Sequence, residues 1–247
     1  MASDRERSRI VETAGRLVEE LESLKRRGSA LLVVGPVVGH DEACTLLLGT
    51  AATAPRRRLF VCTGEGERLS TCAGRSPVAV FWYTSTERST ISESGSSAGA
   101  SPWNAPAVGS PTVGSPTVGS PTDEQRYDSL GSLCRAISDR IDTIESTVDG
   151  LEPAELRVCL DSLTAILADD GPEATFRFLH LLTRKIRSVN GMGHVHWPID
   201  PDDPIVSSVS PLFDAVIALR IEDGAVYQRW TLIDSALETA WLPLEHE

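Results

Sequence analysis

The chain lacks the sequence features that mark membrane and secreted proteins. No apolar run reaches the roughly 18 residues that a membrane-spanning helix needs. The opening stretch, MASDRERSRIVE, is charged and contains no apolar segment of the kind found in secretory signals. We therefore expect a protein that does not enter a membrane and that works in the cytoplasm.

Lysine is scarce. Only Lys25 and Lys185 are lysines among 23 basic residues, and 35 acidic residues bring the net charge to −12 and the pI to about 4.9. This composition resembles that of proteins from salt-loving archaea, whose surface carboxylates stay hydrated where screening lengths shrink to a few ångström. An ordinary acidic cytosolic protein from a GC-rich genome is the alternative. The acidity argues against broad nucleic-acid binding.

Cysteine is also sparse and irregularly spaced. The five cysteines include no C-x-x-C pair, and Cys62 and Cys159 lie inside apolar, strand-like runs. This pattern predicts buried, reduced thiols in a reducing compartment rather than a disulfide framework.

Apolar periodicity predicts an α/β fold with a mostly parallel central sheet, helices on its faces and a closing antiparallel hairpin. An amphipathic helix over 1–27 precedes an α/β domain over 28–247. The segment EDG joins two strand patterns near the end of the chain and indicates the hairpin. The predicted helices are 4–27, 41–53, 126–148 and 172–190, and the predicted strands are 30–35, 58–64, 77–84, 156–163, 191–198 and the two halves of 214–233.

Residues 85–124 differ in composition from the rest of the chain. Ser, Thr, Gly, Pro and Ala dominate, and VGSPT occurs in tandem at 108–112, 113–117 and 118–122. Such a segment has too few apolar side chains to order itself. We expect a disordered insertion that interrupts one domain, because strand and helix patterns resume behind it.

The stretch LLVVGPVVGHDEAC, from Leu31 to Cys44, has the layout of a phosphate-binding loop: a buried strand, a glycine turn and a helix. The chemistry of such a loop is missing. Gly35 and Gly39 are one residue too close, and His40 or Asp41 stands where a phosphate-binding Lys belongs. An aspartate about 4 Å from a phosphate would be unfavourable by about 4 kcal/mol at an effective dielectric of about 20. We expect a vestigial nucleotide site that binds no cofactor.

The second half of the chain carries a family resemblance. The segments RVCLDSLTAIL, FRFLHLLTRKIRSVNGMGHVHW and LFDAVIALR look like the KaiC-like branch of the RecA superfamily of ATPases, and in particular like haloarchaeal members with eroded phosphate loops. The resemblance covers about residues 28–232 and implies a RecA-like P-loop NTPase fold. By the same resemblance, Asp161 matches the strand-end Asp that holds Mg²⁺ through water, and Ser162 follows it. Glu65 and Glu67 lie about where an acidic residue positions the attacking water. The alternative is that Asp161 and Ser162 form a turn and that both glutamates are solvated loop charges.

His194 and His196 are two apart on a predicted strand, so their rings share one face. With Asp200 or Asp202 they would form a metal site, but no fourth ligand is evident. We expect hydrogen-bonded core histidines and no metal.

These patterns together predict a degenerate RecA/KaiC-like protein that is not a catalyst and acts through protein contacts or self-association in regulation or signalling. Two alternatives remain open: an ATP-binding KaiC-like ATPase with a non-standard loop, and a DNA-associated recombinase paralogue. The absent Lys weighs against the first. The lack of a basic face beyond the cluster at 56–58 weighs against the second.

Overall fold

The computed structural model describes residues 4–49, 55–63, 78–84, 123–148 and 150–244. The helices are α1 Asp4–Arg27, α2 His40–Leu48, α5 Leu130–Thr147, α6 Leu163–Ser188, α7 Pro204–Val209 and the 3₁₀ turn η3 Ser210–Leu212. The strands are β1 Ser29–Val34, β2 Arg57–Thr63, β3 Ala79–Tyr83, β4 Asp123–Tyr127, β5 Leu156–Asp161, β6 Met192–Trp197, β7 Ala215–Glu222, β8 Ala225–Leu232, β9 Leu237–Glu238 and β10 Leu242–Pro243.

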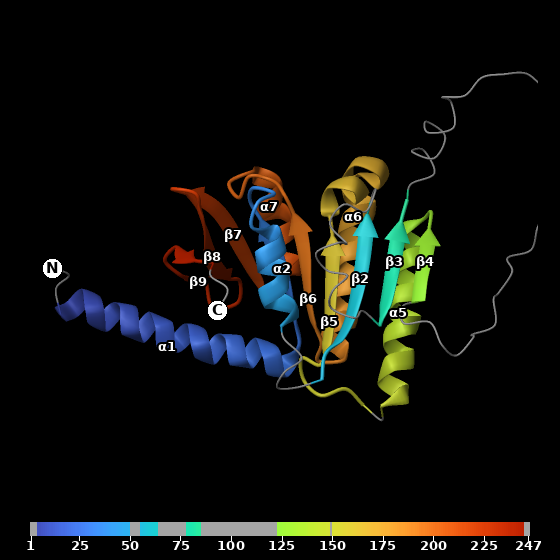
Figure 1. Cartoon of the computed structure of the whole chain (residues 1–247), viewed down its shortest axis with the longest axis horizontal. Coiled ribbons are helices and arrows are strands. Elements are labelled where there is room, and N and C mark those ends of the chain that lie inside the picture. The colour runs from blue at the N-terminus through green and yellow to red at the C-terminus, as the bar shows by residue number, and fades with distance from the viewer. Residues whose placement is uncertain (1–3, 50–54, 64–77, 85–122, 149, 245–247) are drawn as a thin grey trace, which may run out of the picture.

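One mixed sheet organises the described chain (Figure 1). Its strand order is β10-β8-β7-β1-β6-β5-β2-β3-β4, with β9 paired to β8. The strands from β7 to β4 in this order are mutually parallel, whereas β8 pairs antiparallel with β7 and with the two short end strands. The predicted α/β class, with a mostly parallel sheet, flanking helices and a closing hairpin, is confirmed.

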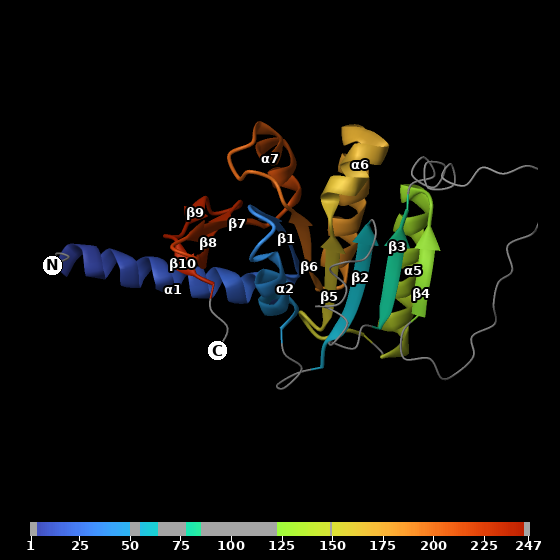
Figure 2. The same cartoon turned by 45° about the horizontal axis from the view of Figure 1, so that its top comes forward.

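Helices cover both faces of this sheet. Successive side chains of a strand point to opposite faces, so apolar side chains on both faces must be buried against helices. Figures 1 and 2 show α2 on one face and α5 and α6 on the other. In β1, Leu32 and Val34 pack in the core under α5 and α6, whereas Leu31 and Val33 face the side of α1 and α2. Each central strand is therefore buried on both faces, which explains why the strands read as continuous apolar runs.

Asp214 connects β1, β7 and α6 at the end of the sheet where β1 and β7 begin, and we call its contacts the Asp214 junction. Asp214, just before β7, accepts hydrogen bonds from the Ala30 amide at 2.8 Å and from Arg187 Nε at 2.9 Å. The Arg187 guanidinium also donates to the Leu212 carbonyl. Asp214 is the acidic residue of LFDAVIALR, so part of that motif serves to join the hairpin to the sheet.

The insertion predicted at residues 85–124 extends two residues too far. Residues 123 and 124 belong to strand β4, which pairs parallel with β3 at the edge of the sheet. The sequence DEQRY has no apolar alternation, and the strand forms because β3 supplies a hydrogen-bonding edge, with Phe81 and Tyr127 in ring contact. Residues 85–122 lie outside the described residues, so the expected disorder there remains a prediction.

Three predicted helices have different ends in the structure. Helix α2 ends at Leu48 rather than at residue 53, because Gly49 adopts a positive φ of 66° and its amide donates to the carbonyls of the last turn. Helix α5 begins later than predicted, at the Ser129 cap. Helix α6 begins earlier than residue 172, at Leu163 after the Ser162 cap, and a non-helical Gly171 followed by Pro172 separates its two segments.

Helix α1 confirms the predicted helix at 4–27. Its C-terminal half packs against the sheet through Leu24, and its N-terminal end lies away from the sheet (Figure 1). Among the helices that the structure describes, none is both long and apolar enough to cross a lipid bilayer.

Candidate functional site

The loop between β1 and α2 requires its two glycines. Gly35 has φ 128° and Gly39 has φ 97°, conformations that side-chain-bearing residues rarely adopt. A Cβ on Gly35 would lie 2.5 Å from the Leu219 carbonyl oxygen, and one on Gly39 would lie 2.6 Å from Val226 Cγ1. The β7–β8 hairpin thus closes against the loop, and both glycines are explained by packing.

Groups of the protein itself occupy the inner side of this loop. The Gly35 amide donates to the Ile199 carbonyl at 2.9 Å, and the His40 amide to the Val37 carbonyl at 3.3 Å. The His40 side chain is fully buried, with Nε2 3.3 Å from the Gly35 carbonyl and Nδ1 2.9 Å from Nδ1 of His196. A phosphate-binding loop needs its amides and its first helical turn to face a ligand. Here His40 points inward instead.

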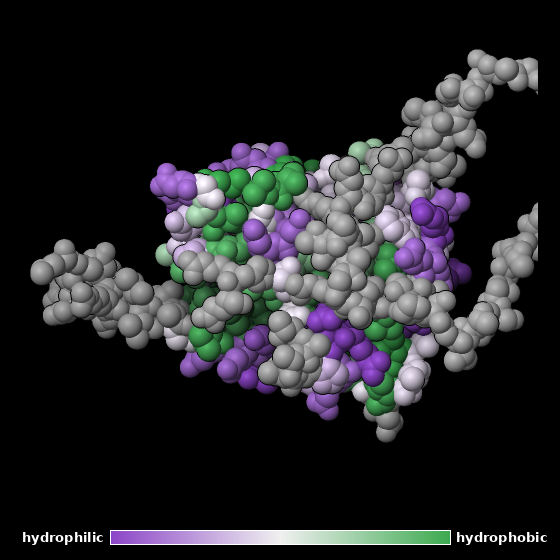
Figure 3. Space-filling view, in the orientation of Figure 1, coloured by the Kyte–Doolittle hydropathy of each residue, from purple (hydrophilic) through white to green (hydrophobic). Residues whose placement is uncertain are grey.

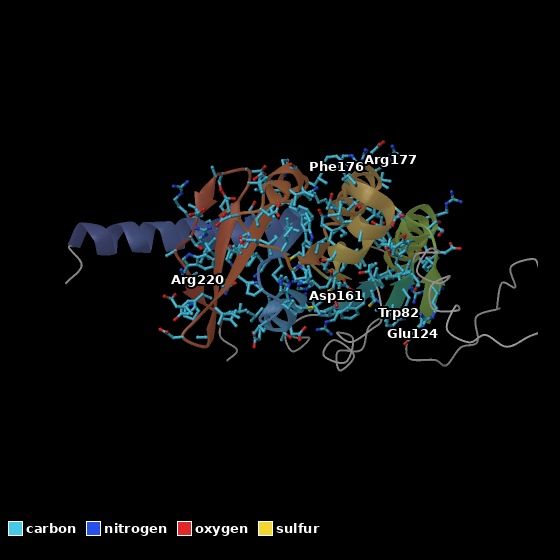
Figure 4. The ribbon with its side chains drawn as sticks, turned by 90° about the horizontal axis from the view of Figure 1, so that it is seen from above. Trp82, Glu124, Asp161, Phe176, Arg177 and Arg220 are labelled. Atoms are coloured by element: carbon cyan, nitrogen blue, oxygen red, sulfur yellow. The ribbon has the colours of Figure 1, made fainter. Side chains whose placement is uncertain are left out.

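The other residues of the predicted nucleotide site lie at the same end of the sheet. Asp161 is the last residue of β5, in register with His196 of β6, which is itself in register with Val33 of β1. Figure 4 looks down on the strand ends and shows Asp161 near the middle of the molecule, between Arg220 and Trp82. Asp41 is exposed in the first turn of α2.

Ser162 has a structural role that accounts for its position. Its hydroxyl accepts from the Thr164 amide and caps α6, while its backbone amide and carbonyl both bond to Thr63 Oγ1, at 2.7 and 2.5 Å. This supports the turn interpretation for Ser162. Glu65 and Glu67 lie outside the described residues.

The histidine pair of β6 lies in a buried cluster that the sequence analysis did not anticipate. The rings of His194 and His196 share one face, with centroids 4.9 Å apart, as predicted. Their neighbours, however, are Cys44 of α2 and Cys159 of β5, not Asp200 or Asp202. One ligand-type atom from each of the four residues lies within 4.8 Å of the others, and all four residues are buried. Asp200 instead accepts from the Asp202 amide in the turn after β6.

The interior of this cluster favours neutral imidazole. Burial is the main cause that lowers the pKa of His194 to about 3, and the positive charge of Arg157 adds to the effect. The His194 imidazole is therefore uncharged at neutral pH. Its Nε2 lies 3.4 Å from Cys44 Sγ. A neutral imidazole beside two thiols can bind a soft or borderline metal ion.

The sequence contained one local signal for this convergence. His40 and Cys44 are four apart, so they lie on the same face of a helix, and His194 and His196 are two apart on a strand. The two pairs of side chains face each other only if helix α2 covers strand β6. Cys159 has no such local signal.

The exposed tip of the loop is apolar. Val37 and Val38 are 61% and 60% exposed, and Ile221, opposite Val226 in the adjoining hairpin, is 46% exposed. Because Val226 packs on Gly39, these side chains lie at one edge of the molecule. Figure 3 shows a band of apolar surface along this edge, above α2. We call the residues Val37, Val38 and Ile221 the loop patch.

Comparison with known proteins identifies a family but no activity. Residues 28–219 match the family of unknown function DUF7504. The chain belongs to this family. The matched residues run from just before β1 into β7, and they include the loop, Asp161 and all four residues of the buried cluster. No curated protein matches the chain.

Proposed function

We propose that this protein is a non-catalytic member of its family that binds no nucleotide and acts by contact with another protein. The observation that carries this proposal is the inward position of His40. Its imidazole fills space that a phosphate would need, and the Ile199 and Val37 carbonyls accept hydrogen bonds from the Gly35 and His40 amides. The missing Lys and the exposed Asp41 remove the positive charge that a triphosphate requires.

The resemblance to the KaiC-like branch of the RecA superfamily supports the same proposal. The strand–loop–helix unit and a strand-end Asp161 are both present, so the chain keeps the layout of a nucleotide-binding protein without its ligands. We propose that it descends from such ATPases. The cytoplasm of a salt-loving archaeon is the setting that its acidic, lysine-poor composition favours.

The loop patch provides the surface for a protein contact. Contiguous exposed apolar side chains at the tip of a loop are a feature of interaction sites. Exposed acidic residues flank the loop patch: Asp41 and Glu42 in the first turn of α2, and Asp223 in the hairpin turn. The partner that fits this surface has an apolar centre with Arg or Lys around it.

Titration calorimetry with Mg-ATP, Mg-ADP and Mg-GTP tests the first half of the proposal. We expect no saturable heat up to about 1 mM, because several charged contacts worth about 1.5–3 kcal/mol each are missing. The ATP-binding alternative keeps one observation in its favour, the position of Asp161 at the strand ends. A signal tighter than about 100 μM that disappears in Asp161→Ala would establish that alternative and overturn ours.

The proposed contact with another protein is tested by comparing variants of the loop patch. Tagged full-length chain is used to capture partners from cells of its own organism, beside a Val37→Ser/Val38→Ser double variant and a Phe176→Ser control. Phe176 is 45% exposed on α6, away from the loop patch. We expect a protein that the wild type and the control retain and the double variant loses. Equal retention by all three variants would refute a contact through the loop patch.

A further inference from the structure

The buried cluster has the ligand composition of a tetrahedral metal site. Cys44 comes from α2, Cys159 from β5, and His194 and His196 from β6. Two cysteines and two histidines form one of the ligand sets that hold structural zinc. The four side chains are between 1% and 4% exposed, so an ion held by them would have no contact with bulk water.

Two distances within the cluster match those between the ligands of a tetrahedral ion. Zinc–sulfur bonds of about 2.3 Å and zinc–nitrogen bonds of about 2.0–2.1 Å place two sulfurs about 3.8 Å apart and a sulfur and a nitrogen about 3.5 Å apart. In the structure, Cys44 Sγ and Cys159 Sγ are 3.6 Å apart, and Cys44 Sγ and His194 Nε2 are 3.4 Å apart. A disulfide would instead need about 2.05 Å between the sulfurs.

The hydrogen bonds of His40 set the tautomer of His196. His40 Nε2 faces the Gly35 carbonyl oxygen, which only accepts, so Nε2 carries the proton. In neutral His40, Nδ1 is then an acceptor, and His196 Nδ1 must donate to it across 2.9 Å. The proton of His196 is therefore on Nδ1, and its buried Nε2 carries the lone pair that a metal binds. Metal-bound histidines are oriented in this way by a hydrogen bond from their other nitrogen.

The charge balance of the cluster also suits a divalent ion. Two thiolates and one Zn²⁺ sum to zero, so the occupied site places no net charge in the interior. The sulfur and imidazole ligands favour zinc over magnesium or calcium, which prefer oxygen.

We propose that Cys44, Cys159, His194 and His196 bind one zinc ion, with His40 as a positioning residue. The site is closed by four protein ligands, so its role is structural. The ion would tie α2 to β5 and β6, and it would hold in place the loop that precedes α2. This proposal is independent of the proposed function, because it concerns neither nucleotide nor partner.

Metal analysis of the purified full chain tests the proposal directly. The protein is produced in zinc-supplemented medium, kept reduced, and purified without a metal-affinity tag. We expect about one zinc per chain by plasma mass spectrometry. In Cys44→Ser and Cys159→Ser the content should fall below roughly one tenth of the wild-type value. Cys62→Ser is the matched control, since Cys62 is a buried cysteine of the same core cluster that is not among the four ligands, and it should keep its zinc.

A second measurement covers the case in which the serine variants do not fold. Wild-type protein stripped of metal is titrated with Co²⁺, which should give visible d–d bands of tetrahedral geometry and thiolate-to-cobalt charge-transfer absorption in the near ultraviolet. Added Zn²⁺ should remove both signals at one equivalent. Reduced wild type that contains no zinc and gives no cobalt bands would overturn the proposal. So would a Cys44–Cys159 disulfide found by mass in metal-free protein, or zinc retained in Cys159→Ser.

Discussion

His40 Nδ1 lies 2.9 Å from His196 Nδ1, and this contact joins the first residue of α2 to the middle of the sheet. The rings are tilted at 60° with centroids 5.1 Å apart, so they do not stack face to face. One pair of residues thus explains two features of the site. It places the His40 ring beneath the loop between β1 and α2, and it leaves Nε2 of His196 as the nitrogen available to a metal ion.

Replacement of His40 should weaken metal binding without abolishing it. In His40→Ala the orienting hydrogen bond to His196 is lost while all four ligands remain, so we expect the zinc affinity to fall roughly 10–100-fold. Competition with a chromophoric chelator measures this change. His180→Ala, an exposed histidine of α6, is the control and should leave the affinity unchanged. Complete loss of zinc at saturation would show that His40 is itself a ligand.

A side chain at Gly35 should destabilise the fold more than backbone strain alone can explain. In Gly35→Ala the new Cβ meets the Leu219 carbonyl oxygen at 2.5 Å, in addition to the cost of φ 128°. Gly150→Ala is the matched control, because Gly150 has φ 106° and open space around its Cβ position. We expect a loss of about 1–2 kcal/mol for Gly150→Ala and of at least about 3 kcal/mol for Gly35→Ala. Urea unfolding measures both, and equal losses would contradict the clash.

The contacts of Asp214 should contribute more to the free energy of unfolding than an exposed ion pair does. Its side chain is only 10% exposed and accepts from Arg187 and from the Ala30 amide. Asp214→Ala leaves both donors without their acceptor, so we expect a loss of about 2–3 kcal/mol in the free energy of unfolding. Asp142→Ala is the control, since Asp142 is 60% exposed in its pair with Lys185. A loss of less than about 1 kcal/mol is expected there.

Stability should rise with salt concentration. The sequence carries 35 acidic and 23 basic residues, and their net repulsion falls as the screening length drops from about 10 Å at 0.1 M to about 3 Å at 1 M salt. Circular dichroism melts between 0.1 M and 3 M KCl measure this effect. A midpoint that does not change with salt would contradict the proposal that the protein comes from a salt-loving organism.

The central strands of the sheet were predictable from sequence, whereas the short strands β9 and β10, the edge strand β4 and the buried cluster were not. Continuous apolar runs such as ALLVV and the EDG turn are local signals, and each appeared as a strand or hairpin in the structure. The strand β4 was missed because its polar sequence pairs only where β3 provides an edge. Cys44 and Cys159 are 115 residues apart in sequence. They meet only because β6 lies between β1 and β5, an order set by long-range pairing that no local pattern reports.

The hydroxyl of Tyr83 should make stability fall at alkaline pH. Burial is the main cause that raises the pKa of Tyr83 well above its usual range, and the hydrogen bond to Asp170 at 2.5 Å adds to the effect. In the unfolded chain a tyrosine loses its proton near pH 10, whereas in the folded chain Tyr83 keeps it. The contribution of this group is therefore fully present below about pH 10 and declines as the pH rises above that value.

Tyr83→Phe separates this effect from that of the other titrating groups. We expect the variant to lose about 1 kcal/mol of unfolding free energy at pH 8, because the hydrogen bond to Asp170 is gone. Between pH 8 and pH 11 the wild type should lose about 1 kcal/mol more unfolding free energy than the variant does, because the variant lacks the Tyr83 hydroxyl whose ionisation is coupled to unfolding. Tyr227→Phe, in the half-buried β8 strand, serves as the control for removal of a tyrosine elsewhere. Urea unfolding of the wild type and the two variants at both pH values gives the six free energies needed, and parallel losses in wild type and Tyr83→Phe would contradict the coupling.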